Sequence, residues 1–234
     1  MTSTSPYRAV LFDFDGVLAD TERLHCQAFR RILETVEQPF TTEEYFNRYI
    51  HFDDLHVFLT VSKDRELGWT PERAERFVEK KRALFTDLMH DPGLLFPGVA
   101  DLVPRLAARL PLAICSMGCR DEIEPVLTGA GLRRLFTALV TADDVEKPKP
   151  DPEVYLRGLE IINNARGQDI QPDECVVVED SSGGTRSGKA AGMQVVAVTH
   201  SITEAELREA GADLILDGIP ALSKYLLQTE EPPK

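Results

Sequence analysis

Six short apolar runs recur along the chain and alternate with segments of helical periodicity. The runs are rich in β-branched residues and nearly continuous in hydrophobicity, which is typical of strands buried on both faces of a parallel sheet. They are Ala9–Phe12, Leu112–Cys115, Leu139–Thr141, Cys175–Val178, Val195–Val198 and Leu214–Leu216. Helix-period segments begin at Gly98, Arg120, Pro152, Gly184 and Thr203. The alternation predicts an α/β fold with a doubly wound parallel sheet.

One long stretch, 21–95, shows helix signals and no convincing strand. Its first apolar positions recur every four residues, at Leu24, Ala28, Ile32 and Val36, and give one apolar face. Thr70 followed by Pro71 is typical of a helix N-cap with proline at the first helical position. We therefore expect an all-helical domain at 21–95, inserted into a core that is made of 1–20 and 96–234.

Composition narrows the classes of partner. The formal net charge is -13, so nucleic acid and anionic membrane surfaces are poor partners. No apolar run approaches the about 20 residues that a membrane-spanning helix needs. The polar first residues do not resemble a signal peptide, and the four cysteines form no CxxC pair. We expect a cytoplasmic protein, monomer or homodimer, with reduced thiols.

Two acidic residues, Asp13 and Asp15, follow the first apolar run and precede Gly16. In an open parallel sheet, ligands bind beyond the carboxyl ends of the strands, so both carboxylates are expected at such a crevice. Two acids this close repel each other unless a cation lies between them. Taken alone, a structural turn that ends the strand is an equal alternative.

Polar residues at three further strand ends strengthen the functional reading. Ser116-Met117-Gly118 offers a hydroxyl and backbone N–H groups that can hold a phosphoryl group. Lys147 lies in a proline-bounded loop, and Glu179-Asp180 offers oxygen ligands for a hard cation such as Mg²⁺. A helix cap, a basic loop and a solvated cap are the separate alternatives. Their coincidence at successive strand ends favours one site.

These positions resemble the four motifs of haloacid dehalogenase-like hydrolases, in order and spacing over the whole chain. The resemblance rests on Asp13-Phe14-Asp15-Gly16-Val17-Leu18, Ser116, Lys147 and Glu179-Asp180. The helical insert resembles the cap domain of the subgroup of β-phosphoglucomutase and the sugar-phosphate and phosphoglycolate phosphatases. The resemblance implies a Rossmann-like core, Mg²⁺ as cofactor and a small phosphorylated metabolite as substrate.

The resemblance also implies a role for each motif residue. Asp13 is expected to attack phosphorus and form an aspartyl-phosphate, and Asp15 to act as general acid and base. Ser116 and the N–H groups of Met117 and Gly118 are expected to hold the phosphoryl oxygens, and Lys147 to neutralise charge. The expected metal ligands are Asp13, Asp15 (through its backbone carbonyl), Glu179 and Asp180. Asp15 disfavours dehalogenation, because dehalogenases of the superfamily lack that second acid.

The insert leaves the choice of substrate open. His25 and Arg120 are candidate substrate-binding residues, although a structural histidine and a helix-opening arginine are equal alternatives. A mutase would need a cation for a second phosphate, for which Arg48, Lys80 and Lys81 are candidates. The leading hypothesis is a phosphatase. The alternatives are a β-phosphoglucomutase-like sugar phosphomutase and a non-catalytic binding or regulatory protein on the same fold.

Overall fold

The computed structural model describes residues 7–50, 52–89 and 92–228. Its contacts divide the chain into two compact units, Thr21–Asp91 and the remainder, Met1–Asp20 with Pro92–Lys234. We call the first the helical unit and the second the core unit. The sequence placed the end of the insert four residues later, at 95. Within the described residues, no helix is long and apolar enough to cross a membrane.

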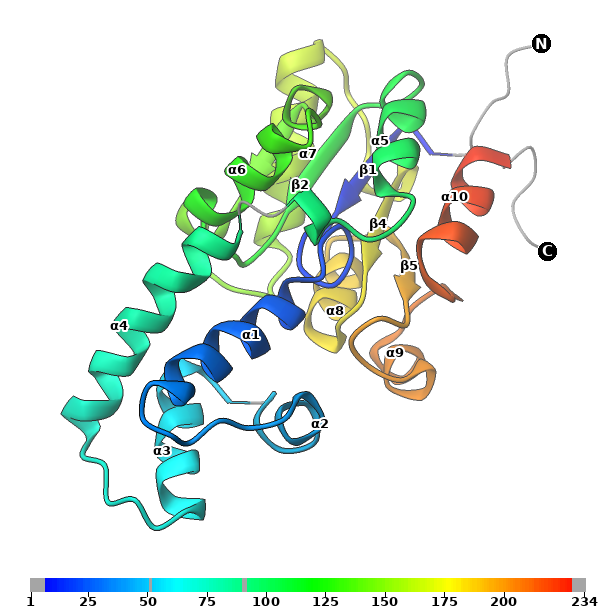
Figure 1. The fold of residues 1–234 in the computed structure, drawn as a ribbon. Coiled ribbons are helices and arrows are strands. Elements are labelled where there is room, and N and C mark those ends of the chain that lie inside the picture. The colour runs from blue at the N-terminus through cyan, green and yellow to red at the C-terminus, as the bar shows by residue number, and fades with distance from the viewer. Residues whose placement is uncertain (1–6, 51, 90–91, 229–234) are drawn as a thin grey trace. The chain divides into compact units, whose positions relative to one another are not determined.

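The core unit contains a parallel sheet of six strands (Figure 1). The strands are β1 (Ala9–Phe12), β2 (Leu112–Cys115), β3 (Ala138–Val140), β4 (Cys175–Glu179), β5 (Gln194–Val198) and β6 (Leu214–Leu216). Their order is β3-β2-β1-β4-β5-β6. The predicted doubly wound fold is confirmed, and three of the six predicted strands have the observed bounds.

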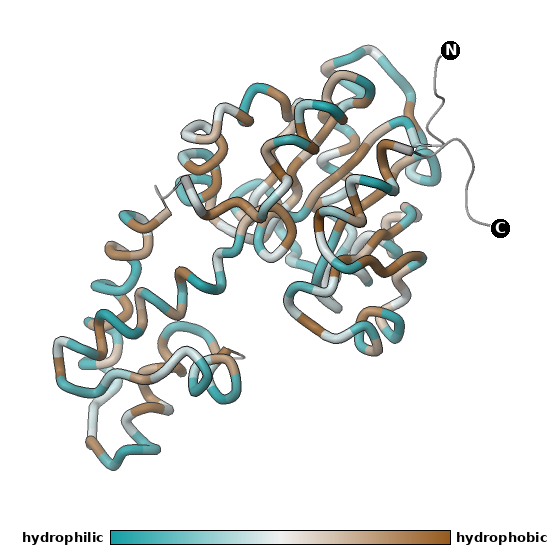
Figure 2. The backbone as a smooth tube through the Cα atoms, turned by 45° about the vertical axis from the view of Figure 1, so that its right-hand side comes forward, coloured by the Kyte–Doolittle hydropathy of each residue, from teal (hydrophilic) through white to brown (hydrophobic). Residues whose placement is uncertain are grey.

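Helices connect and cover the strands. They are α5 (Val99–Ala107), α6 (Arg120–Gly129), α7 (Glu153–Arg166), α8 (Ser182–Ala190), α9 (Glu204–Ala210) and α10 (Gly218–Gln228). Helix α7 packs on β1, β2 and β3, α8 packs on β4 and β5, and α5 contacts α10. Figure 2 shows hydrophobic strands within the core unit and helices that alternate between hydrophobic and hydrophilic positions. The sequence pattern did not predict α10.

The strand order creates one switch point, between β1 and β4. From β1 the chain winds outward through β2 and β3, and from β4 it winds the other way through β5 and β6. Phe12 pairs with both Ile114 and Val178, so the carboxyl ends of β1, β2 and β4 lie at the same edge. A crevice at such a switch point is where doubly wound proteins bind ligands.

The helical unit contains α1 (Thr21–Glu34), α2 (Thr42–Glu44), a π-helical turn at Tyr45–Tyr49, α3 (Asp54–Asp64) and α4 (Pro71–Leu88). Its core is rich in aromatic side chains, among which Phe29 and Phe77 contact Phe58. Thr70 caps α4 and Pro71 is its first residue, as the sequence predicted. This core is separate from that of the sheet, so each unit buries apolar surface of its own.

Candidate active site

Asp13 lies directly after β1, and a buried lysine holds its carboxylate. The Nζ atom of Lys149 donates to Asp13 Oδ1 at 2.9 Å and to Glu179 Oε1 at 2.7 Å. The side chain of Lys149 is 9% exposed. The structure thus brings residues at or beyond the ends of three different strands into one hydrogen-bonded group.

The prediction that Lys147 would be this lysine is wrong. The side chain of Lys147 is 70% exposed and lies 3.8 Å from Asp151. Glu153 fixes the loop by accepting hydrogen bonds from the backbone N–H groups of Glu146 and Lys147. The N–H of Asp151 then donates to the Pro148 carbonyl, which closes a turn that carries Lys149 instead to Asp13.

Glu179, the last residue of β4, is completely buried, and polar groups surround its carboxylate. Tyr155 Oη donates to Glu179 Oε1 at 2.8 Å, alongside Lys149. The other oxygen accepts from the backbone N–H of Asp180 at 3.0 Å, and from the N–H and hydroxyl of Ser181 at 3.1 and 2.9 Å. These hydrogen bonds hold the Glu179 side chain in place.

The three acids of the site have shifted pKa values. Burial raises the pKa of Asp13 to about 7, although the Lys149 ammonium acts in the opposite direction. Burial, together with the charges of Glu179 and Asp13, raises the pKa of Asp180 well above its usual range. For Glu179 burial also opposes charge, but Lys149 and the hydrogen bonds outweigh it and lower the pKa. With all three ionised, the acids would carry more negative charge than Lys149 offsets, and burial and mutual repulsion therefore favour the neutral forms of Asp13 and Asp180.

An oxygen ligand set for a metal ion is present. One carboxylate oxygen from each of Asp13, Glu179 and Asp180 lies within 4.8 Å of the others. Lys149 offsets one of the three charges, which leaves an excess that a divalent cation would match. All three donors are hard oxygen ligands, so the residues fit a hard divalent cation.

Asp15 and Ser116 meet at the ends of β1 and β2. Ser116 is completely buried, and its hydroxyl donates to Asp15 Oδ2 at 3.0 Å. The backbone N–H of Gly118 donates to Ser116 Oγ at 2.9 Å. Met117 and Gly118 are partly exposed. The structure thus joins the predicted phosphate loop directly to the second acid.

Arg120 is the first residue of α6, and its guanidinium hydrogen-bonds to residues of β3 and of the turn that follows it. It donates to the Leu139 carbonyl at 3.0 Å and to the Asp144 carboxylate at 2.7 Å. This geometry agrees with the helix-opening alternative, since the side chain ties α6 to the end of β3.

His25 belongs to a polar cluster inside the helical unit. Its Nδ1 lies 2.6 Å from the Nζ of Lys81, which also donates to both carboxylate oxygens of Asp54. The His25 ring stacks on Phe85. Because the ammonium is a donor, Nδ1 must accept, so the neutral imidazole carries its proton on Nε2. The cluster fixes the tautomer of the histidine.

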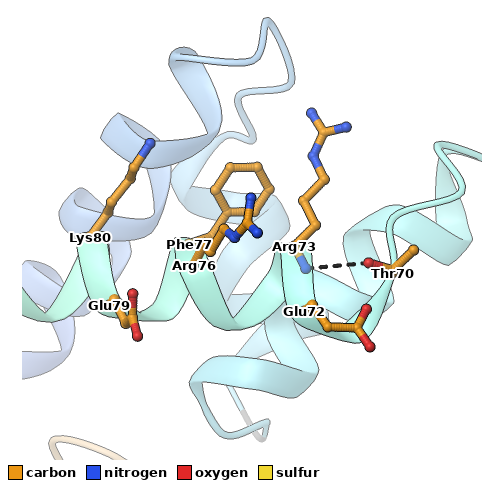
Figure 3. Close-up of a pocket in the computed structure, with 7 residues that line it drawn as sticks. All are labelled: Thr70, Glu72, Arg73, Arg76, Phe77, Glu79 and Lys80. Carbon is orange, nitrogen blue, oxygen red and sulfur yellow. Dashed lines mark hydrogen bonds between the residues drawn. The ribbon is translucent and has the colours of Figure 1, made fainter.

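Two of the three cations considered for a second phosphate have partners in the helical unit. Arg48 forms a two-fold hydrogen bond with Asp64, and Lys81 is 2% exposed beside Asp54. Lys80 is exposed and lines a hollow of about 540 Å³ on α4 (Figure 3). Arg73 and Arg76 line the same hollow, together with Glu72 and Glu79. Its charge is therefore mixed.

Sequence reasoning missed several residues of the site. Lysine–proline occurs at 147 and again at 149, so the sequence did not show which of the two lysines belongs to the site, and Lys149 was missed. Tyr155 lies in α7 and has no motif spacing of its own. Ser201 follows β5, and its hydroxyl donates to Asp180 Oδ2. Extending the search for polar strand ends to the fifth strand would have found it.

Comparison with known proteins gives the family. The profile of haloacid dehalogenase-like hydrolases matches residues 10–198. A phosphorylated carbohydrates phosphatase from Thermotoga maritima is 33% identical over 208 residues, which are 87% of this chain and 91% of that protein.

Solved structures of the same superfamily share the fold. One is a putative β-phosphoglucomutase from Thermotoga maritima, with 30% identity and a TM-score of 0.74 over 94% of this chain and 97% of the other. Another is CbbY from Rhodobacter sphaeroides in complex with xylulose-1,5-bisphosphate, with 26% identity and a TM-score of 0.68 over 91% and 94%. Since the family profile covers most of the chain and includes Asp13, Asp15, Ser116, Lys149, Glu179 and Asp180, this protein belongs to the haloacid dehalogenase-like hydrolases.

Proposed function

We propose that the chain is a Mg²⁺-dependent phosphatase that hydrolyses a small sugar or organic-acid phosphate through an aspartyl-phosphate on Asp13. The observation that carries the proposal is the group formed by Asp13, Lys149 and Glu179, with Asp15 two residues after Asp13. The relative that is named a phosphatase of phosphorylated carbohydrates supports the substrate class. In this proposal the helical unit is the cap that selects the substrate.

The chemistry follows from the residues. A carboxylate oxygen of Asp13 attacks phosphorus, a new O–P bond forms, and the bond from phosphorus to the leaving oxygen breaks. Asp15 gives its proton to that oxygen, while the Ser116 hydroxyl, which donates to Asp15 before substrate binds, turns to a phosphoryl oxygen. Asp15 then takes a proton from a water molecule that attacks the aspartyl-phosphate, which releases inorganic phosphate and restores Asp13.

Charge stabilisation provides much of the rate, since phosphoryl transfer requires little covalent chemistry from the protein. Lys149 neutralises Asp13 as the anionic substrate approaches, and Ser116 with the loop N–H groups holds the phosphoryl oxygens. Asp13, Glu179 and Asp180 would hold Mg²⁺, with the Asp15 backbone carbonyl as a further ligand. The bound ion would supply positive charge to the phosphoryl group.

Phosphate release across a panel of phosphorylated metabolites, with and without Mg²⁺, tests the proposal. We expect release from a few sugar or organic-acid phosphates, dependent on Mg²⁺ and abolished in Asp13→Asn. Asp101→Asn is the matched control, because Asp101 is an exposed residue of α5 whose salt bridge, among the described residues, is with Arg105 on the same helix. Equal release by wild type and Asp13→Asn would contradict the aspartyl-phosphate.

A sugar phosphomutase is the second candidate, favoured by the likeness to the putative β-phosphoglucomutase. A mutase needs a second phosphate site and a bisphosphate activator. Arg48 is paired with Asp64 and Lys81 with Asp54, so the charge of each cation is already offset by an acid, which argues against a second phosphate site there. We therefore expect net phosphate release to exceed isomerisation of hexose phosphates, measured by product chromatography with added bisphosphate. If neither phosphate release nor isomerisation is detected, the non-catalytic alternative is favoured.

A further inference from the structure

The loop after β5 reaches two parts of the proposed site through consecutive residues. The Ser201 hydroxyl donates to Asp180 Oδ2. The neighbouring His200 places Nδ1 2.8 Å from the carbonyl oxygen of Gly16. A carbonyl can only accept, so Nδ1 carries the proton in this contact. We call these two residues the His200–Ser201 clamp.

Gly16 shows how closely the clamp and the site pack. Its φ is +70°, which favours glycine. A Cβ atom at this position would lie 1.7 Å from Asp180 Oδ2 and 2.7 Å from Ser201 Oγ. The backbone that follows Asp15 is therefore packed closely against the Asp180 carboxylate and the Ser201 hydroxyl.

The clamp is itself held in place within the core unit. The His200 ring stacks on Phe96, with ring centres 4.1 Å apart and planes at 25°. The N–H of Phe96 donates to the carbonyl of Leu18, in the same turn that contains Gly16. On another side of the ring, a Cβ on Gly218 would lie 2.8 Å from Nε2. The imidazole is thus fixed by packing and by a hydrogen bond.

We propose that Ser201 and His200 are positioning residues, Ser201 for the metal ligand Asp180 and His200 for the turn that carries Asp15. The inference rests on the proposed function. A carboxylate has two oxygens, and the hydroxyl of Ser201 holds Oδ2, so Oδ1 remains to face the cation. His200 holds the carbonyl of Gly16, the residue after Asp15, and so helps to set where the general acid lies.

Mg²⁺ binding tests the Ser201 half without any substrate. The thermal unfolding midpoint is followed as MgCl₂ is titrated into the full chain, which gives an apparent Kd because a bound ligand stabilises the folded state. Removal of an outer-shell partner of a metal ligand weakens metal binding by roughly 10- to 100-fold, so we expect about 10-fold for Ser201→Ala. Ser201→Thr keeps the hydroxyl and is expected to restore binding.

Thr203→Ala is the matched control. Thr203 lies in the same loop, where the hydrogen bonds of its hydroxyl, within the described residues, go to Glu206 and cap α9. This variant is expected to lower the unfolding midpoint without changing the Kd for Mg²⁺. Equal Kd values for Ser201→Ala and wild type would overturn the proposal, as would equal weakening in Thr203→Ala.

Steady-state kinetics at saturating Mg²⁺ test the His200 half. Asparagine can place an N–H donor near the position of Nδ1, and alanine cannot. We expect His200→Ala to lower kcat by about 10-fold or more with little change in KM, as loss of correct acid positioning would. His200→Asn is expected to recover most of that loss. Wild-type kcat in His200→Ala, or no difference between the two variants, would overturn this half.

The two proposals can fail separately. A wild-type chain that binds Mg²⁺ but releases no phosphate from any metabolite contradicts the proposed function. The comparison of Mg²⁺ affinities between Ser201→Ala, Ser201→Thr and Thr203→Ala still decides whether the clamp positions Asp180.

Discussion

Lys149 contacts two acids of the site, so its replacement is the sharpest single-residue test of the geometry. Lys149→Ala would leave the buried Asp13 and Glu179 carboxylates without their cation. We expect kcat to fall by about 10²–10³-fold, the range for loss of one preorganised electrostatic contact. Phosphate release under saturating Mg²⁺ measures the effect.

Lys147→Ala is the control, because it removes the same charge two residues away from an exposed position. Its activity is expected to stay within about 2-fold of wild type, as surface substitutions usually have small effects. A larger loss in Lys147→Ala than in Lys149→Ala would assign the role to the lysine that sequence reasoning first selected.

These two lysines also show where sequence reasoning reaches its limit at the residue scale. Asp13 and Glu179 were predictable because each is fixed to the end of a buried strand, whose direction also fixes the side chain. Lysine–proline occurs twice in the loop before α7, and sequence spacing cannot decide which copy faces inward. That choice depends on Glu153 holding the backbone at 146 and 147, which is a tertiary contact.

At the scale of elements, α7 packs on the sheet at Gly158, where there is no room for a side chain. A Cβ at 158 would lie 2.5 Å from Cys115 Sγ and 3.2 Å from Leu11 Cδ2. Gly158→Ala is therefore expected to lower the free energy of unfolding by about 1–3 kcal/mol through overpacking, despite the better helix propensity of alanine. Urea unfolding measures the change.

Gly129→Ala provides the opposite case in α6. Nothing lies within 4 Å of a Cβ built at 129, so alanine meets no steric cost there. We expect unchanged or slightly higher stability, by up to about 1 kcal/mol. If both glycine variants gained stability, the close approach of α7 to β1 and β2 would be refuted.

The strands were easier to predict than the helices. Each strand contains a nearly continuous apolar run, buried in β1 to β4 and partly buried in β6, and three strands, including β1, begin and end where expected. Helix α8 begins two residues before the predicted start because Ser181 caps it. Helix α10 opens with Gly218 and contains Pro220, and these residues are more typical of a loop.

At the scale of the whole molecule, the helical unit makes folding sensitive to pH. Burial, reinforced by the Lys81 ammonium, lowers the pKa of His25 to about 3. The unfolded chain takes up this proton near pH 6.5, before the folded chain does, so the stabilisation is present above that pH and is lost as the pH falls toward 3.

Urea unfolding of wild type and His25→Gln at pH 7, 6 and 5 measures this contribution. We expect the free energy of unfolding of wild type to fall more steeply below pH 6.5, by up to about 1.4 kcal/mol per pH unit relative to the variant. Other titrating groups contribute equally to the pH dependence of both proteins, so their contributions cancel when the two free energies of unfolding are subtracted. Parallel profiles would mean that folded His25 accepts a proton as readily as the unfolded chain.

The central place of β1 has a consequence for synthesis on the ribosome. Residues Ala9–Phe12 emerge early, but their partners Leu112–Ile114 follow only after the whole helical unit, and Cys175–Val178 follow later still. The helical unit has its own aromatic core, so it can fold before the strands that pair with β1 have been synthesised. A chain stalled before β2 should therefore protect the amides of α1 and α4 from exchange and leave those of β1 open.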